Sequence, residues 1–189
     1  MSALNDNSYR AYDCLGCHQE KNRCVFRVWA PNAQYVSVVG DFNEWNGYAA
    51  PMSRDLDGIW SAEIEGIRPG DIYKYAVTGP DGRTVLHADP FAFHAETGPA
   101  TGSKVWNLKG FRWSDRKWMK ARPGTNLREK PMNIYEVHLG SWRKGEDEVW
   151  PNYKNIAAPL AEYCRTMGYT HVELLPVTEY PFEGSWGTR

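Results

Sequence analysis

The hydrophobic pattern of this chain changes period near Asn133, and this change limits the possible fold more than any other feature. Over residues 24–77 apolar side chains alternate with polar ones, which predicts half-buried β-strands. After Asn133 two nearly continuous apolar runs follow instead, residues 134–139 and 171–175, as in parallel strands buried on both faces. We therefore expect an all-β domain, then a strand, a helix and a second, parallel strand.

The alternating part predicts an immunoglobulin-like β-sandwich over residues 1–115, because short strands at this spacing, bounded by turn residues, are typical of sandwiches. The expected strands carry Phe26 and Val28; Val36 and Val38; Trp60, Ala62 and Ile64; and Tyr73, Tyr75 and Val77. Residues 79–82, Gly-Pro-Asp-Gly, are a strong hairpin signal. Residues 116–131 are expected to connect the sandwich to a second domain over residues 132–189.

Between the two apolar runs, a helical period is carried by Ile156, Leu160, Tyr163, Cys164 and Met167. Gly168 is expected to end this helix. Pro159 weakens it unless the helix begins only just before that residue.

Charge and composition point to a neutral partner. The chain has 22 basic and 23 acidic residues, so neither nucleic acid nor an anionic membrane surface is expected as a partner. Aromatic residues make up 14% of the chain and include nine Trp. Exposed Trp beside polar side chains suits a sugar, although a Trp-rich core is the equally open alternative. No run is long enough to span a membrane and no signal peptide is recognisable, so a cytoplasmic location is expected.

The cysteines are not expected to hold a cofactor. Cys14, Cys17 and His18 have the spacing of a haem-attachment motif, but such attachment occurs in exported proteins. Adding Cys24 makes a possible zinc set with irregular spacing, whereas structural zinc sites usually contain two ordered pairs. Cys164 is expected to be a buried helical residue.

Several segments resemble a known family. Residues 25–33 (Val-Phe-Arg-Val-Trp-Ala-Pro-Asn-Ala) and 36–45 (Val-Ser-Val-Val-Gly-Asp-Phe-Asn-Glu-Trp) resemble the starch-binding type of carbohydrate-binding module that precedes α-amylase-like barrels. Residues 134–142, 168–177 and 180–187 resemble the first two barrel strands of 1,4-α-glucan (glycogen) branching enzymes, including Gly-Ser-Trp after the first and Gly-Ser-Trp-Gly after the second. The resemblance covers nearly the whole chain.

The resemblance implies a glucan-binding sandwich followed by the first β-α-β unit of an incomplete (β/α)₈ TIM barrel. Such enzymes cut an α-1,4-glucan and transfer the segment to a 6-hydroxyl, forming α-1,6 branches in glycogen biosynthesis. Their catalytic carboxylates are on the fourth, fifth and seventh barrel strands, so the resemblance assigns no catalytic residue here. We therefore expect this chain alone to be catalytically inactive and at most a weak α-glucan binder.

The expected carbohydrate-binding residues are Trp45, Lys74 and Trp60, although the register of Trp60 with Ala62 and Ile64 also fits a core position. Related modules carry a second tryptophan where this chain has Arg83-Thr84, which should weaken binding. The expected substrate-groove residues, on loops after the two barrel strands, are Trp142, Tyr180, Phe182 and Trp186.

Two further interpretations are open. The family continues after Gly187 with Tyr-Gln, where this chain has Thr188-Arg189, so a free-standing, non-catalytic glucan-binding or targeting protein is the alternative. Two Glu and two His on the barrel strands also form a possible metal set, but we expect them to hydrogen-bond to one another in a barrel layer and to bind no metal. These residues are Glu136, His138, His171 and Glu173.

Overall fold

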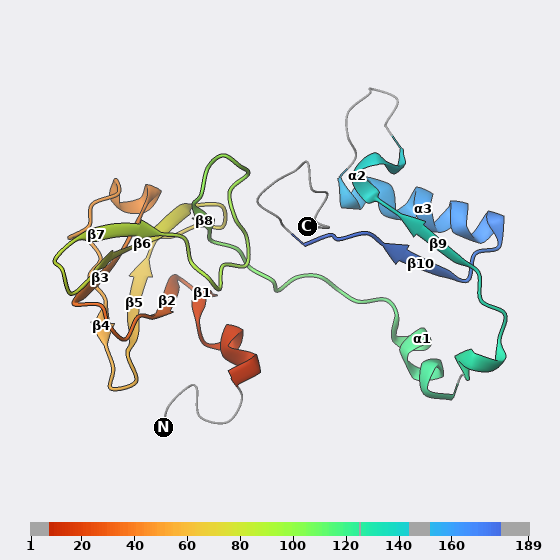
Figure 1. The fold of residues 1–189 in the computed structure, drawn as a ribbon, viewed down its shortest axis with the longest axis horizontal. Helices are drawn as coiled ribbons and strands as arrows, with labels where there is room; N and C mark the ends of the chain where they lie inside the picture. The colour runs from red at the N-terminus through yellow and green to blue at the C-terminus, as the bar shows by residue number, and fades with distance from the viewer. Residues whose placement is uncertain (1–7, 125, 144–151, 179–189) are drawn as a thin grey trace. The chain divides into compact units, whose positions relative to one another are not determined.

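The computed structural model describes residues 8–124, 126–143 and 152–178 (Figure 1). Their contacts divide the chain into two compact units, residues 1–112 and 113–189. The expected boundary lies three residues later, at the end of the 1–115 segment. Each unit is described by itself.

Unit 1 consists of two facing antiparallel sheets. Sheet A has the order β1-β2-β5-β4, from β1 (Gly16–Glu20), β2 (Arg23–Trp29), β5 (Ile59–Glu65) and β4 (Ser53–Arg54). Sheet B has the order β3-β6-β7, from β3 (Tyr35–Gly40), β6 (Ile72–Thr78) and β7 (Thr84–His87), and β8 (Ser103–Lys104) also pairs with β6. Two short 3₁₀ helices, η1 (Ser8–Asp13) and η2 (Asp41–Asn43), precede β1 and follow β3.

The strands predicted by the alternation form as β2, β3, β5 and β6. Their inward positions make one core, in which Phe26, Tyr73 and Tyr75 are fully buried. The predicted turn closes the β6–β7 hairpin, where the Gly82 N–H donates to the Gly79 carbonyl at 3.0 Å. The sandwich part of the expected fold is therefore confirmed.

A buried carboxylate, Asp89, is part of this core. It accepts hydrogen bonds from Tyr73 Oη at 2.6 Å, Tyr75 Oη at 3.2 Å and the Phe91 N–H at 2.8 Å. Burial raises the pKa of Asp89, and these hydrogen bonds oppose that shift because they favour the ionised form. The network joins β6 to the segment that leads toward β8.

One edge of the sandwich is closed by a segment that crosses between the sheets. The Val38 N–H donates to the Ala50 carbonyl at 3.0 Å, and the Met52 N–H donates to the Val36 carbonyl at 2.9 Å, along the edge of β3. The chain then enters β4, which pairs with β5 only at Ser61 and Trp60. The remainder of this edge of β5 has no β4 partner.

Unit 2 begins with α1 (Arg116–Ala121), η3 (Arg122–Gly124) and η4 (Leu127–Glu129). It continues with β9 (Ile134–Val137), the one-turn α2 (Leu139–Trp142), α3 (Tyr153–Met167) and β10 (His171–Leu174). The two strands are parallel, with Ile134 opposite His171 and Val137 opposite Leu174. The expected strand-helix-strand order is present, but the first strand ends at Val137 and α2 begins at Leu139, the last residue of the expected strand.

α3 covers one face of the two-stranded sheet. Its buried residues Ile156, Leu160 and Cys164 lie four apart, on one side of the helix. The helix begins well before Pro159, with the Asn152 side chain accepting from the Asn155 N–H, and it ends at Gly168 with φ 77°. Val172 and Leu174 remain about half exposed, contrary to the expected burial of both strands on both faces. Within the described ranges, no helix is long and apolar enough to cross a membrane.

Candidate functional site

The first part of the candidate site is the loop after β3, which carries Trp45. A side chain at Gly40 would clash with the Ile72 carbonyl oxygen, so glycine permits the close approach of β3 to β6 here. The Asn43 side chain accepts from the Gly40 N–H and donates to the Val38 carbonyl, both at 2.9 Å. These contacts fix the loop to the end of β3.

Trp45 has an unusual backbone conformation. Both Glu44 and Trp45 are left-handed, with φ of 53° and 60°. This region costs a non-glycine residue about 1–2 kcal/mol, and such strain persists only where surrounding contacts maintain it. The Trp45 N–H donates to the Gly40 carbonyl at 3.1 Å, which contributes to that support.

The indole of Trp45 is 40% exposed and is oriented by Asp41. Indole Nε1 donates to Asp41 Oδ1 at 3.3 Å, while Asp41 Oδ2 accepts from the Ile72 N–H at 3.1 Å. One carboxylate thus joins the tryptophan to the first residue of β6. The polar edge of the ring is satisfied within the protein, while a large part of the ring remains available to a flat ligand.

Lys74 lies near this junction, on the outer face of sheet B. Its neighbours Tyr73 and Tyr75 point into the core, so the alternation directs Lys74 outward, as expected. Lys74 Nζ donates to Thr101 Oγ1 at 2.7 Å. The adjoining Gly102 N–H donates to Glu96 Oε2 at 2.7 Å. The ammonium of Lys74, the hydroxyl of Thr101 and the carboxylate of Glu96 are therefore all close to β6.

Thr84 occupies the same outer face, on β7. It is paired in register with Thr78, and the two hydroxyl oxygens are 2.8 Å apart. Thr78 and Lys74 are four residues apart on β6 and therefore share one face. Thr84 is thus exposed on the sheet face that carries Lys74, at the other end of β6, and it offers a hydroxyl in place of a ring.

The assignment of Trp60 as a contact residue is wrong. Its side chain is only 6% exposed and lies within the core cluster of unit 1. Nε1 donates to the Ala30 carbonyl at 2.9 Å, so the polar atom of the ring is already satisfied. Packing between the sheets, which the register with Ala62 also indicated, prevents Trp60 from stacking on a ligand.

The expected substrate-groove residues belong to unit 2. Trp142 packs against the cluster of Val137, Leu160 and Cys164, and its Nε1 donates to Tyr135 Oη at 2.9 Å. Part of the Trp142 ring is therefore covered by packing within unit 2. Tyr180, Phe182 and Trp186 are outside the described residues.

Neither possible metal set forms a cluster: in the described part of the chain, no three His, Cys, Asp or Glu side chains are placed to hold a metal ion. Cys17 and Cys24 are buried in the core, whereas the His18 ring contacts the Leu15 carbonyl at 2.9 Å. Glu136 and Glu173 are register partners on β9 and β10, while the His138 ring bonds to Ser141 Oγ and the His171 ring to Thr170 Oγ1, each at 2.8 Å.

Sequence reasoning did not identify Asp41 or Thr101 as parts of the site. Both contacts join segments that are far apart in the chain: Asp41 reaches Ile72, and Thr101 reaches Lys74. The only local signal for Asp41 is its position four residues before Trp45 in a turn-rich loop.

Comparison with known proteins supports the interpretation of unit 1. Residues 14–92 match the family described as carbohydrate-binding module 48 (isoamylase N-terminal domain). This match covers most of both sheets and includes Trp45 and Lys74. Unit 1 is thus similar to the modules of that family over residues 14–92.

The similarity to individual proteins extends further. The chain is 48% identical to the 1,4-alpha-glucan branching enzyme GlgB of Aromatoleum aromaticum over 180 residues, which are 94% of this chain and 28% of the relative. It is 46% identical to the enzyme of the same name from Fusobacterium nucleatum, over 94% of this chain and 29% of the relative. The chain therefore spans less than a third of these relatives, and it corresponds to their amino-terminal part.

A solved structure shows the same arrangement of elements. The apo pullulanase of Klebsiella pneumoniae matches with a TM-score of 0.63 and 26% identity, covering 94% of this chain and 22% of that protein. The fold of this chain is therefore similar to that of a segment of the pullulanase.

Proposed function

Because residues 14–92 match carbohydrate-binding module 48 and the chain matches the amino-terminal part of glucan branching enzymes, we propose that it serves such an enzyme by binding α-glucan through unit 1. The observation that carries this proposal is the exposed indole of Trp45, maintained in a left-handed backbone conformation and anchored by Asp41. Trp45 is the expected stacking platform, and Lys74 with Thr101 supplies the polar contacts.

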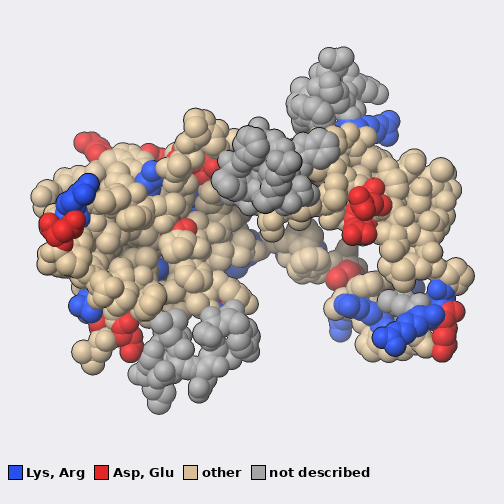
Figure 2. Space-filling model, viewed as in Figure 1, with Lys and Arg blue, Asp and Glu red and all other residues tan. Residues whose placement is uncertain are grey.

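The chemistry of an α-glucan fits this arrangement. The apolar C–H face of a glucose ring can pack on an indole, while the ring hydroxyls donate to and accept from nearby polar groups. Figure 2 shows that basic and acidic side chains are interspersed over the visible face of the sandwich, which suits a neutral ligand. A single stacked ring contributes about 1–3 kcal/mol, by analogy with nucleic-acid bases, so the affinity should be weak.

We further propose that β9, α3 and β10 are the first unit of a (β/α)₈ barrel. Parallel strands joined through a helix that covers one face are the repeating unit of such barrels. The face away from α3 carries Glu136 and Glu173, and barrel interiors contain layers of side chains from neighbouring strands. The half-exposed Val172 and Leu174 indicate apolar surface that further barrel elements would cover.

No catalytic residue is proposed within this chain. Retaining transfer between glucans needs a nucleophilic carboxylate and an acid–base carboxylate about 5 Å apart. In the family that the chain resembles, these groups are on later barrel strands. Branching, the formation of α-1,6 links in glycogen biosynthesis, would therefore require the remainder of an enzyme of this kind.

Affinity electrophoresis in gels containing glycogen tests the binding proposal. Wild type should be retarded, and Trp45→Ala should be clearly less retarded than wild type while keeping its unfolding temperature. Trp113→Ala removes an exposed indole of unit 2 and is the matched control. Trp60→Phe changes a buried ring and should keep the retardation of wild type. Unretarded wild type would reject glucan binding, whereas full retardation of folded Trp45→Ala would reject the site.

Incubation with amylose, followed by iodine staining, tests the second part of the proposal. The purified chain should leave the stain unchanged because the catalytic carboxylates of the family it resembles are on later barrel strands. A reproducible shift of the absorbance spectrum, after contaminating enzyme has been excluded, would show that the chain has catalytic groups of its own.

A further inference from the structure

We propose that unit 1 has a second α-glucan subsite on the outer face of sheet A, centred on Trp29 and flanked by Arg27, Ser61 and Ser53. This inference rests on the proposed glucan-binding function but concerns the sheet opposite the one that carries Lys74. It therefore adds a binding surface to the one built from Trp45.

The indole of Trp29 is exposed and anchored. Trp29 ends β2, between the inward-facing Val28 and the start of the next turn, and 55% of its surface is accessible. Indole Nε1 donates to the Asp57 carbonyl at 3.2 Å, and the next residue, Ala30, donates its N–H to the Gly58 carbonyl at 3.0 Å. The β4–β5 hairpin thus orients both the ring and its backbone.

The Trp29 and Trp45 rings share two properties that favour stacking on a ligand. In both residues the indole N–H is satisfied within the protein and a large part of the ring faces solvent. A ring oriented in advance loses little conformational entropy when a flat ligand packs on it. Among the described residues of unit 1, the exposed indoles are those of Trp29, Trp45 and Trp106. The Trp106 ring packs edge-on against His94, which leaves Trp29 as the second candidate for stacking.

Polar side chains form a row next to Trp29 on the same face. Trp29 pairs with Ile59, and two residues away along the strands Arg27 pairs with Ser61, which in turn pairs with Ser53. Because Phe26, Val28, Trp60 and Ala62 face the core, alternation directs Arg27 and Ser61 outward. The row crosses three strands at a spacing of about 4.8 Å and offers one guanidinium and two hydroxyls.

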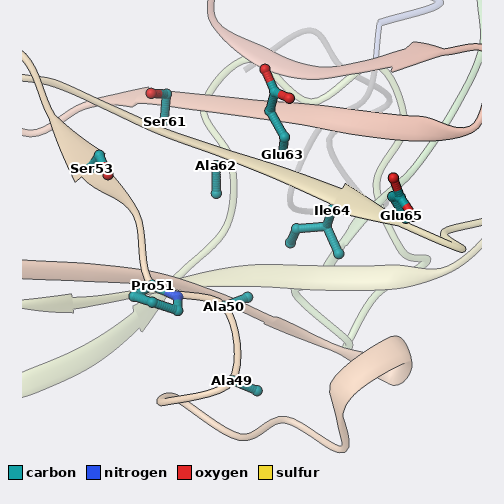
Figure 3. Close-up of a pocket in the computed structure, with 9 residues that line it drawn as sticks. All are labelled: Ala49, Ala50, Pro51, Ser53, Ser61, Ala62, Glu63, Ile64 and Glu65. Atoms are coloured by element: carbon teal, nitrogen blue, oxygen red, sulfur yellow. The ribbon is translucent and has the colours of Figure 1, made fainter.

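A cavity of about 510 Å³ continues from this row along the edge of β5 (Figure 3). Ser53 and Ser61 are among its lining residues, and Ala50, Ala62 and Ile64 provide apolar surface. Figure 3 shows Ser61, Glu63 and Glu65 on one side of β5 and Ala62 and Ile64 on the other, so the cavity passes the strand edge that β4 leaves uncovered. Alternating apolar and hydrogen-bonding surface suits the sugars that follow the one stacked on Trp29.

The polar row favours a sugar over a protein partner. Leu56, at the tip of the hairpin, is fully exposed and together with Trp29 could form a small apolar contact. The centres of protein interfaces are depleted of charged and small polar residues, whereas Arg27 and Ser61 lie next to Trp29 and its buried partner Ile59 on this sheet face. A neutral ligand with many hydroxyls can pack on the Trp29 ring and hydrogen-bond to the polar row.

Titration calorimetry with maltoheptaose, together with glycogen affinity electrophoresis, tests the inference on the full chain. Wild type should bind two maltoheptaose molecules, and Trp29→Ala and Trp45→Ala should each bind one. The double variant should lose both. Trp29→Phe, which keeps a ring, should retain part of the affinity, while Arg27→Ala should weaken the second site by about tenfold, as expected for loss of one hydrogen bond to a charged group.

Leu56→Ala is the matched control, because it removes the exposed apolar group without touching the ring or the row. It should leave both sites intact, and loss of the second site in this variant would contradict the role of the polar row.

If wild type binds and Trp29→Ala or Arg27→Ala binds identically, the second subsite does not exist although glucan binding by unit 1 remains. If Trp45→Ala has no effect and Trp29→Ala abolishes binding, the proposed first site is wrong and Trp29 is the platform. Absence of binding by wild type rejects both proposals.

Discussion

Asp41 joins Trp45 to strand β6: one carboxylate oxygen accepts from the indole N–H at 3.3 Å, and the other accepts from the Ile72 N–H at 3.1 Å. The orientation of the stacking ring is therefore coupled to the strand that carries Lys74. This coupling explains how a loop residue in a strained backbone conformation can be part of a preorganised site.

Asp41→Ala should weaken glucan binding severalfold even though Asp41 need not contact the sugar. Loss of two hydrogen bonds, each contributing about 1 kcal/mol, releases the ring and loosens the loop. Asp41→Asn keeps one acceptor and should have an intermediate affinity. Calorimetric titration with maltoheptaose measures the effect, and wild-type affinity in folded Asp41→Ala would show that the contact is incidental.

Thr84→Trp should strengthen glucan binding about fivefold. The substitution places a second ring on the outer face of sheet B, on the strand next to the one that carries Lys74, and a stacked ring contributes about 1 kcal/mol or more. Arg83→Trp is the matched control, since it adds the same ring in the turn one residue earlier. Equal affinities of the two variants would indicate nonspecific adhesion instead of a second stacking position.

Asp89→Asn should change how stability depends on pH. Burial raises the folded-state pKa of Asp89, so the folded protein binds the proton more tightly than the unfolded chain does. Between the unfolded pKa, about 3.9, and the higher folded pKa, rising pH therefore lowers the wild-type free energy of unfolding through this group. Above the folded pKa the contribution is constant.

The measurement is urea unfolding of wild type and Asp89→Asn across this range. The asparagine variant lacks the titrating group, so the difference in unfolding free energy, wild type minus variant, should fall as pH rises and then level off. Tyr73 and Tyr75 retain partners in both proteins, and any constant offset between them does not affect the slope. A difference independent of pH would mean that Asp89 has the same proton affinity in both states.

The sequence predicted those parts of the fold in which local pattern and packing agree. Alternation identified β2, β3, β5 and β6 because their inward residues all enter one core. It could not identify β4, whose two residues are both exposed and are defined only by pairing with β5. Asp41, Thr101 and the Trp29 surface were missed for the same reason, since strand pairing and tertiary contacts determine their neighbours.

Trp60 and Pro159 show how one signal can override another. Family resemblance suggested a contact role for Trp60, but its position in the β5 alternation placed it in the core. The Pro159 signal suggested a late helix start, but the Asn152 cap and the burial of Ile156 extend α3 toward the N-terminus. Packing and capping thus outweigh the local cost of a proline.

Pro159→Ala should stabilise unit 2 by about 1–3 kcal/mol. Pro159 is the seventh residue of α3, so its ring removes a helical N–H donor and opposes the preceding turn. The residue is exposed, and its replacement should not disturb the contact of Leu160 with Val137. Slower cleavage within α3 under limited proteolysis would report the gain, and unchanged or faster cleavage would show that the helix tolerates the proline without strain.

Hydrogen exchange should show that the two units differ in stability. In unit 1 the backbone groups of β2 are paired on both sides, by β1 and β5, and its inward side chains are fully buried. In unit 2, β9 and β10 pair only with each other among the described residues, and only Val137 of their eight residues is buried.

Amides of β9 and β10 should therefore exchange orders of magnitude faster than those of β2, because local opening of the second sheet exposes little apolar surface. Mass spectrometry of peptic peptides resolves the two regions, and equal protection in a monomer would require that another part of this chain covers the second sheet.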